Sequence, residues 1–322
     1  MSMLKSVAPA LSSSVQRLHS VSSHISSYST STTTTMVSAS KQQPVISFIG
    51  GGNMAEAILG GLHANGHPGS RLKYSEPLEE RRNYMKTKYP ELVSARDNED
   101  AVEGADVVIL AVKPQVLRGV MTSLSPALLR NQSVLIISIA AGITTTDMVR
   151  WLNAPNENNV SIIRCMPNTP ALIGEGAMGL YATQHVTEEQ RRLTESIMGA
   201  VSKQVSWVRK ESLIDTVTGI SGSGPAYFFL IMEAMQNAGI AAGLSPEDAK
   251  ALTLQTCVGA ARMAQESEDD LATLRRKVTS PKGTTEAAIK SMEADGIRKV
   301  MENAVLSAQN RGRQLAEELG RD

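Results

Sequence analysis

The chain has 322 residues, of which 42% are hydrophobic and 20% are charged, so it is long enough to form two domains with sizeable cores. Its 32 basic and 32 acidic residues give a formal net charge of zero, which implies no bulk attraction to nucleic acid or to an anionic membrane. No stretch of the sequence is apolar over the length that a membrane span needs.

Residues 1–44 differ in composition from the rest of the chain. They are rich in Ser and Thr and contain Lys5, Arg17 and Lys41, and the first acidic residue of the chain is Glu56. Such a segment cannot bury enough apolar surface to fold alone, and its composition is typical of an organellar transit peptide. We expect a disordered leader that directs the protein to the plastid, or a disordered tail on a cytoplasmic protein.

The stretch 45–62, VISFIGGGNMAEAILGGL, predicts a buried strand, a tight turn and a helix. Gly50, Gly52 and Ala55 fill the dinucleotide fingerprint G-x-G-x-x-G/A, in which the glycines allow a sharp turn and a close approach of backbone to pyrophosphate. The free N–H groups of the new helix then face the phosphates. A simple structural turn is the alternative. The residues that we assign to cofactor binding here are Gly50, Gly52, Asn53 and Met54.

Residues 71–75 predict a second strand. The residues that follow such a strand contact the adenine ribose and distinguish NADPH from NADH. Ser75 can donate a hydrogen bond to a 2′-phosphate, and Arg81 and Arg82 lie one helical turn further on. Glu76 would repel such a phosphate unless its side chain is turned away. We predict NADPH as the cofactor, with NADH as a possibility.

Three further apolar runs, 106–112, 133–139 and 160–166, predict buried parallel strands that end in small or turn-forming residues. The carboxyl ends of parallel strands form the cofactor crevice of an open α/β sheet, although proline and asparagine also simply end strands. Short extra strands are predicted at 179–182 and 204–208, and the first domain should close near Lys210. The residues expected to border the nicotinamide are Ala111, Lys113, Pro114, Ala140, Asn168 and Thr169.

After residue 211 the pattern is helical. A glycine-rich turn at 218–224 precedes Pro225, which suits the first position of a helix. The predicted helix 225–242 is apolar on nearly every side and should be central and buried. The next helix, 246–265, is apolar or small around most of its surface, and we infer that it is buried against a second subunit.

The segment 278–286, VTSPKGTTE, leads into predicted helices at 285–294 and 297–308. Its turn at 281–285 points backbone N–H groups outward at a helix start, where an anion such as a carboxylate can bind. An ordinary threonine N-cap is the alternative interpretation.

Cys165 and Cys257 are far apart in sequence and have no C-x-x-C partner, which is typical of a reduced, intracellular protein. The five histidines lack metal-ligand spacing to one another or to a cysteine or carboxylate. We therefore expect no metal.

Several motifs together resemble the pyrroline-5-carboxylate reductase family. They are the glycine fingerprint, LAVKPQ at 110–115, MPNTP at 166–170, SGSGPAY at 221–227 and VTSPKGTTEAAI at 278–289. The resemblance spans about 45–307, and the last motif is the most specific. Lys282 departs from the family pattern, because some members have Gly at this position.

The resemblance implies an α/β fold, in which an N-terminal Rossmann-type doubly wound sheet is followed by an all-α C-terminal dimerisation domain. The domains would be a leader at 1–44, a dinucleotide-binding domain at 45–210 and a substrate-binding and dimerisation domain at 211–322. The implied reaction is hydride transfer from NAD(P)H to 1-pyrroline-5-carboxylate, which gives L-proline, by a homodimer that assembles further into a decamer.

The resemblance also implies roles for individual residues. The amides of Gly283 and Thr284 would hold the substrate carboxylate, and the hydroxyl of Thr285 would meet the ring nitrogen as the catalytic group. The substrate-binding set comprises Val278, Gly283, Thr284 and Thr285. Ser75 and Asn98 would bind near the adenosine ribose or its 2′-phosphate.

Two other functions fit parts of the sequence. A β-hydroxyacid dehydrogenase has a similar two-domain shape but uses a lysine on the helix that enters the second domain, where this chain has Tyr227, Phe228 and Phe229. A non-catalytic NADPH-binding redox sensor would keep the glycine fingerprint without needing the anion site at 281–285.

Overall fold

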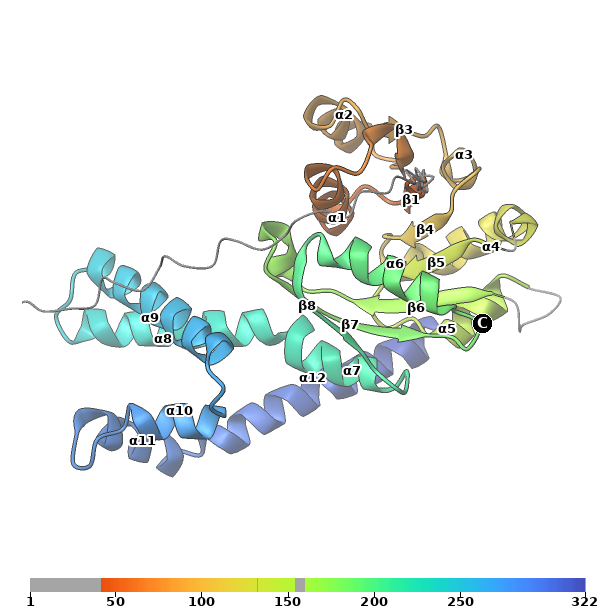
Figure 1. Cartoon of the computed structure of the whole chain (residues 1–322). Helices are drawn as coiled ribbons and strands as arrows, with labels where there is room; N and C mark the ends of the chain where they lie inside the picture. The colour runs from red at the N-terminus through yellow and green to blue at the C-terminus, as the bar shows by residue number, and fades with distance from the viewer. Residues whose placement is uncertain (1–41, 132, 154–159, 322) are drawn as a thin grey trace, which may run out of the picture. The chain divides into compact units, whose positions relative to one another are not determined.

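Eight strands form one sheet in the computed structural model, which describes residues 42–131, 133–153 and 160–321 (Figure 1). The strands are β1 (Ile46–Ile49), β2 (Leu72–Ser75), β3 (Val93–Ser94), β4 (Val107–Leu110), β5 (Leu135–Ser138), β6 (Ser161–Met166), β7 (Gly176–Ala182) and β8 (Ser202–Trp207). Their order is β3-β2-β1-β4-β5-β6-β7-β8, and the β6–β7 pair is antiparallel whereas the others are parallel. Of the predicted leader 1–44, residues 1–41 lie outside the described part of the chain.

The first six strands have the order 3-2-1-4-5-6 that a doubly wound dinucleotide-binding fold requires. The connecting helices are α1 (Asn53–Ala64), α2 (Glu79–Lys88), α3 (Asn98–Val102), α4 (Pro114–Arg130), α5 (Thr145–Trp151) and α6 (Glu188–Gly199). The predicted fold class is therefore confirmed. The longer predicted strands are also confirmed, although each is shorter than its apolar run.

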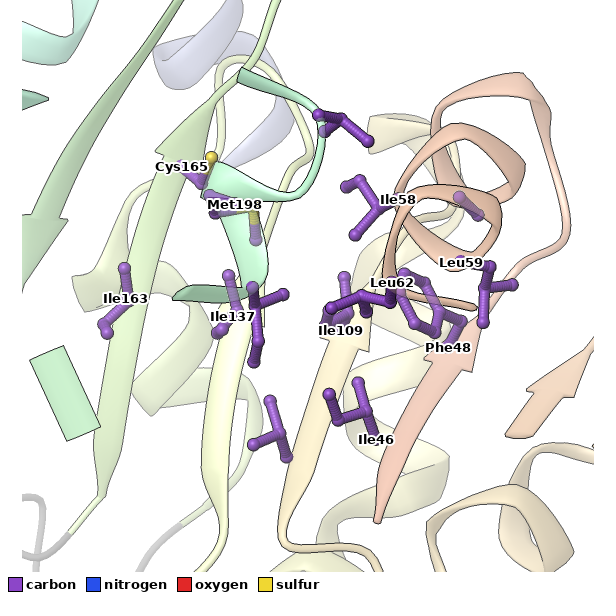
Figure 2. Packing of buried hydrophobic residues seen from close by; sticks show 14 of the residues in the cluster. Ile46, Phe48, Ile58, Leu59, Leu62, Ile109, Ile137, Ile163, Cys165 and Met198 are labelled. Carbon is purple, nitrogen blue, oxygen red and sulfur yellow. The ribbon is translucent and has the colours of Figure 1, made fainter. Parts of the chain in front are cut away.

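Both faces of the sheet are buried, which explains why its strands are apolar at successive positions. Ile46 and Phe48 face α1, where they meet Ile58 and Leu59 in a cluster that also contains residues of β4, β5 and β6 (Figure 2). Alternate residues, beginning with Ile49, point to the other face and pack in a second cluster with α3, α4 and α5. The sheet is thus packed on both faces, and the segments that follow its strands lie at its edges.

A helical region follows β8. Its helices are α7 (Leu213–Val217), α8 (Gly224–Ala241), α9 (Pro246–Glu266), α10 (Leu271–Lys277), α11 (Thr284–Ala294) and α12 (Ile297–Leu319). The prediction of a glycine-rich turn before Pro225 was wrong, because Thr218–Gly222 forms a π-helical turn, η4, that joins α7 to α8. In this turn the Ser223 N–H donates to the Thr218 carbonyl at 2.8 Å. The last helix is longer than predicted, and it contacts both α7 and η4.

Helix α8 is not buried within a single chain, which contradicts its prediction as a central helix. Phe228 is 62% exposed, Phe229 63% and Leu230 67%. On α9, Leu252 is 58% exposed and Val258 45%, as expected for a helix that needs a second subunit to cover it. No helix in the described ranges is long and apolar enough to cross a membrane.

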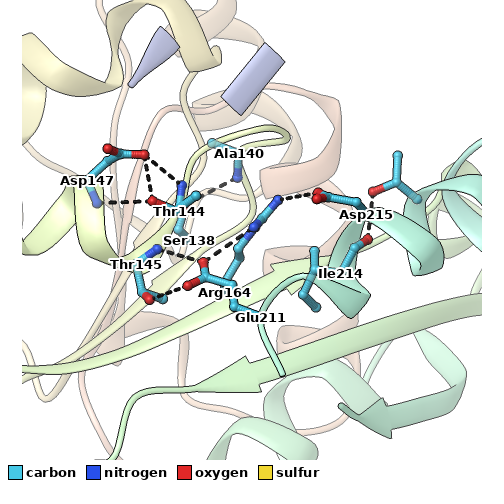
Figure 3. Close-up of polar contacts among 10 residues, drawn as sticks. Ser138, Ala140, Thr144, Thr145, Asp147, Arg164, Glu211, Ile214 and Asp215 are labelled. Carbon is cyan, nitrogen blue, oxygen red and sulfur yellow. Dashed lines mark hydrogen bonds and ion pairs between the residues drawn. The ribbon is translucent and has the colours of Figure 1, made fainter. Parts of the chain in front are cut away.

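A buried ion network joins the sheet to the start of the helical region (Figure 3). Arg164 on β6 is 3% exposed, and its guanidinium pairs with Glu211 at 3.3 Å and with Asp215 at 3.1 Å. Glu211 also accepts hydrogen bonds from the N–H and the hydroxyl of Thr145, at 2.7 and 2.6 Å, at the start of α5. One strand residue therefore fixes both the linker that leaves β8 and helix α7.

We expect Arg164→Met to lower the free energy of unfolding by about 3–5 kcal/mol, because it leaves two largely buried carboxylates without their cation. Urea denaturation measures the change. The triple variant Arg164→Met, Glu211→Gln, Asp215→Asn removes all three charges and should recover most of the loss. A single-variant loss below about 1 kcal/mol, the value of an exposed pair, would contradict the network.

Candidate active site

The turn after β1 requires glycine at its first position. Gly50 has φ +102°, and a Cβ there would lie 2.7 Å from the carbonyl oxygen of Ala111 at the end of β4. The Gly50 N–H donates to the carbonyl of Ser75 at 2.9 Å. The ends of three neighbouring strands are therefore held together at Gly50.

Gly52 leaves open space in front of helix α1. It is the N-cap residue, with φ −66° and ψ 178°, and no atom lies within 4 Å of the position a Cβ would take. Asn53 and Met54 are the first helical residues, and the N–H groups of a first turn have no partner within the helix. Ala55 is 1% exposed, as its place in the fingerprint requires for close packing. This geometry fits a pyrophosphate.

The predicted adenosine-side residues lie together. Ser75, which is 3% exposed, donates from its hydroxyl to Oδ1 of Asn98 at 2.6 Å. Asn98 begins α3, which follows Asp97 as its N-cap. The two side chains that the sequence assigns to the adenosine side are therefore in direct contact.

Glu76 is turned onto the glycine loop, which sequence reasoning left open. Its Oε2 accepts the Gly51 N–H at 2.9 Å and its Oε1 accepts the Leu78 N–H at 2.9 Å. Arg81 donates from Nε to the Gly51 carbonyl at 2.6 Å, and Arg82 donates to the Glu76 carbonyl at 2.6 Å. In this structure the Glu76 carboxylate is occupied by backbone N–H groups, and two arginines lie beside the same loop.

The residues predicted to border the nicotinamide lie at the ends of β4, β5 and β6. Ala111 directly follows β4, and Lys113 and Pro114 are the N-cap and first residue of α4. Ala140 follows β5, is 4% exposed, and its N–H donates to the hydroxyl of Ser138 at 3.3 Å. Asn168 follows β6 and begins the 3₁₀ helix η3 (Thr169–Ile173). The structure thus brings the predicted nicotinamide-side residues to one edge of the sheet.

The predicted substrate loop is an uncapped helix start. Gly283 is the N-cap of α11 and has no side chain that could cap it, so the alternative of a threonine N-cap is wrong. Lys282 has φ +60°, a conformation that glycine adopts without strain. The Gly283 N–H also donates to the Ser280 carbonyl at 3.0 Å. The first-turn amides of Thr284 and Thr285 have no partner within the helix.

Glu286 stabilises the turn from inside the helix. Its Oε2 accepts the Lys282 N–H at 2.7 Å, and its Oε1 lies 3.1 Å from the ammonium of Lys290. The Lys282 N–H and the Lys290 charge hold the pKa of Glu286 below its usual value. The sequence did not predict this role, which an acid four residues after Lys282 could have indicated.

The substrate loop and the cofactor edge are not brought together within one chain. Helix α11 packs on α12, and Figure 1 shows α10 and α11 at the opposite end of α12 from the strands. Val278 is 59% exposed, and Thr284 and Thr285 are exposed. The candidate active site therefore has two separate halves in the single chain.

The described residues contain no cluster of three His, Cys, Asp or Glu side chains that could hold a metal. Cys165 and Cys257 are free thiols. Cys165 is buried in the core of the sheet, and burial raises the pKa of its thiol well above the ordinary value. This cysteine is a small apolar core residue, as the sequence suggested.

Two family models match the chain. Residues 211–315 match the family described as pyrroline-5-carboxylate reductase dimerisation. Residues 45–142 match the family described as NADP oxidoreductase, coenzyme F420-dependent. The two matches fall on the helical region and on the first half of the sheet.

Curated relatives match over nearly their whole length. The pyrroline-5-carboxylate reductase of Pseudomonas aeruginosa is 48% identical over 277 residues, which are 86% of this chain and 98% of the relative. That of Pisum sativum is 38% identical over 272 residues, with 84% and 96% of the two chains covered.

Two solved structures are also similar to this chain over nearly their whole length. A pyrroline-5-carboxylate reductase from Coxiella burnetii has a TM-score of 0.79 and 43% identity, covering 85% of this chain and 98% of that one. A pyrroline carboxylate reductase from Plasmodium falciparum with NADP bound has a TM-score of 0.74 and 29% identity, covering 85% and 99%.

We expect Gly52→Asp to weaken dinucleotide binding strongly without harming the fold. The space in front of Gly52 accepts a side chain, aspartate is a good N-cap, and the helix should gain a few tenths of a kcal/mol. Its carboxylate would take the first-turn amides and repel the pyrophosphate, so the Kd for NADPH should rise about 100-fold or more. Fluorescence titration and thermal melting measure the two effects.

Gly52→Ala is the matched control, because it adds the Cβ without the charge. It should weaken NADPH binding much less than Gly52→Asp. Equal NADPH affinity in Gly52→Asp and the wild type would place the pyrophosphate elsewhere.

Proposed function

The chain belongs to the pyrroline-5-carboxylate reductase family, and from this premise we propose how its residues carry out the reaction. It is an NADPH-dependent oxidoreductase that reduces 1-pyrroline-5-carboxylate to L-proline, and it forms a homo-oligomer through its dimerisation domain. When bound, the reduced nicotinamide supplies the hydride. The uncapped start of α11 is the observation that carries the proposed substrate site.

We propose that the substrate carboxylate binds at the turn of Gly283 and Thr284, with the Thr284 amide as the free donor, because the Gly283 N–H already donates to the Ser280 carbonyl. Gly283 leaves the helix start open, and the Thr284 amide points from the first turn of α11. The helix dipole adds roughly 0.3–1 kcal/mol for an anion there, and up to about 2 kcal/mol if the site is partly buried. Val278, which precedes the turn, would contact the apolar side of the ring.

Thr285 is the proposed catalytic residue. Its hydroxyl lies one residue after the proposed carboxylate site, where it can donate to or accept from the ring nitrogen of the cyclic imine. Imine reduction needs no strong general base, because the imine nitrogen protonates near neutrality. The residues of this site therefore mainly align the imine and manage one proton.

The proposed cofactor site extends along the carboxyl edge of the sheet. The cradle that only glycine permits at Gly50, and the open space at Gly52, support its pyrophosphate position. The paired side chains of Ser75 and Asn98 support a place for the adenosine ribose and its 2′-phosphate. The residues that complete the proposed set are Asn53, Met54, Ala111, Lys113, Pro114 and Ala140.

We propose that each active site is completed by two chains of the homodimer. The separation of the two halves in one chain supports this, and so do the exposed apolar side chains of α8 and α9. The family match at 211–315 supports the domain division at 45–210 and 211–322. We also propose further assembly of dimers into a decamer, as the family resemblance implies.

We propose that residues 1–44 are a leader and that the enzyme works in the plastid or the cytoplasm. The Ser-rich, acid-free composition supports import into a plastid. Met36 is a second methionine within the leader, and a start there would remove most of the leader and leave the enzyme in the cytoplasm.

Thr285→Ala should lower kcat/KM for pyrroline-5-carboxylate by about tenfold to a hundredfold. This corresponds to the roughly 1.5–3 kcal/mol of a hydrogen bond to a charged group. Steady-state rates at saturating NADPH measure it. Thr285→Ser keeps a hydroxyl and should retain most of the rate, whereas NADPH affinity should be equal in all three proteins. An unchanged kcat/KM in Thr285→Ala would remove this residue from the mechanism.

Co-expression of Gly52→Asp and Thr285→Ala chains should restore activity if the site spans two chains. Random pairing makes half of the dimers mixed, and each mixed dimer has one site with both halves intact. The mixture should reach about a quarter of the wild-type rate, well above either parent. If each site lay within one chain, no mixed dimer would contain an intact site, and the rate would stay at the parental average.

A further inference from the structure

The side-chain amide of Asn168 is fully oriented by two backbone groups. Asn168 is 8% exposed; its Nδ2 donates to the carbonyl of Ser221 at 3.1 Å, and its Oδ1 accepts the N–H of Ala177 at 2.9 Å. A donor faces a carbonyl and an acceptor faces an N–H, so the two partners allow one orientation of the amide. The side chain thus links the end of β6 to β7 and to the π-helical turn η4.

The Ser221 carbonyl needs the Asn168 amide as a donor because the residue four positions later is a proline. In an α-helix the carbonyl of residue 221 would accept the N–H of residue 225, and Pro225 has none. The next N–H, that of Ala226, donates to the Ser223 carbonyl at 3.1 Å. Asn168 therefore supplies, from the sheet, the hydrogen bond that the helix itself cannot make at Ser221.

The π-helical turn is also held closely on two other sides. A Cβ on Gly219 would lie 2.7 Å from the Val305 carbonyl of α12, and a Cβ on Gly222 would lie 2.7 Å from Cε of Met166. The turn lies where α7 passes into α8, whose exposed apolar residues belong to the dimerisation region. A small shift at this joint would change the direction of α8.

We propose that Asn168 is a positioning residue: by donating to the Ser221 carbonyl it sets the direction of α8, and it does not act by contact with the cofactor. The direction of α8 determines how two chains meet, and so how the substrate loop of one faces the nicotinamide edge of the other. A misplacement of about 1 Å at reacting atoms costs on the order of 100-fold in rate. The inference rests on the proposed two-chain site for its effect on the reaction.

The test is a double-mutant cycle of Asn168→Ala and Pro225→Ala. Asn168→Ala should lower kcat/KM for pyrroline-5-carboxylate by about tenfold to a hundredfold, while the Kd for NADPH changes by less than about twofold. Pro225→Ala alone should stay close to wild type. In the double variant the new N–H at residue 225 can donate to the Ser221 carbonyl, so the rate should recover at least about fivefold.

Other outcomes overturn the proposal. A raised Kd for NADPH in Asn168→Ala, without rescue by Pro225→Ala, would make Asn168 a cofactor contact. A wild-type kcat/KM in Asn168→Ala would show that the joint does not need this bond. If Asn168→Ala does not fold, a double variant that folds and shows a cooperative melting transition supports the proposal. A double variant that also fails to fold overturns it. Failure of the two-chain site would appear separately, in the co-expression of Gly52→Asp and Thr285→Ala chains.

Discussion

The connection between the sheet and the helical region depends on one strand, β6. Arg164 and Asn168 are four residues apart in an extended segment, so their side chains point to the same side of the sheet. Arg164 binds Glu211 and Asp215, and Asn168 binds the Ser221 carbonyl. The segment that leads into the dimerisation helices is therefore held at both ends by buried, directional contacts. Such contacts weaken steeply when angles change, so they define one arrangement of the two regions rather than a range.

The fold was predictable because its signals are local. Apolar runs marked the parallel strands, and the glycine fingerprint between a strand and a helix marked the phosphate loop, where Gly50 meets the end of β4. The predicted strands extend one or two residues beyond the observed ends. Val45 and Ile139 continue the apolar runs and still hydrogen-bond to β4, although they lie outside the strand bounds. Ser75 was proposed from its place at the end of the second predicted strand, whereas Asn98 came only from family resemblance.

The remaining features of the site arise from contacts between distant parts of the sequence. Glu76 binds the N–H of Gly51, 25 residues away, and Asn168 binds the carbonyl of Ser221, 53 residues away. Neither partner leaves a periodic signal. The predicted burial of α8 was wrong for another reason: hydropathy reports that a surface needs covering, but not which chain covers it. A helix that is apolar on every side can be completed by a partner as well as by its own domain.

Cofactor binding and substrate binding depend on assembly in different ways in the proposed site. The glycine loop, Ser75 and Asn98 lie at neighbouring strand ends of one chain, so the proposed dinucleotide site draws on a single chain. The helix start at Gly283 lies beyond α10 and reaches no cofactor edge of its own chain. Burial of the exposed apolar residues of α8 and α9 would then stabilise the dimer and assemble the site for imine reduction at once. In the proposed site, cofactor binding therefore depends on the fold of one chain, whereas catalysis depends on the assembly of two.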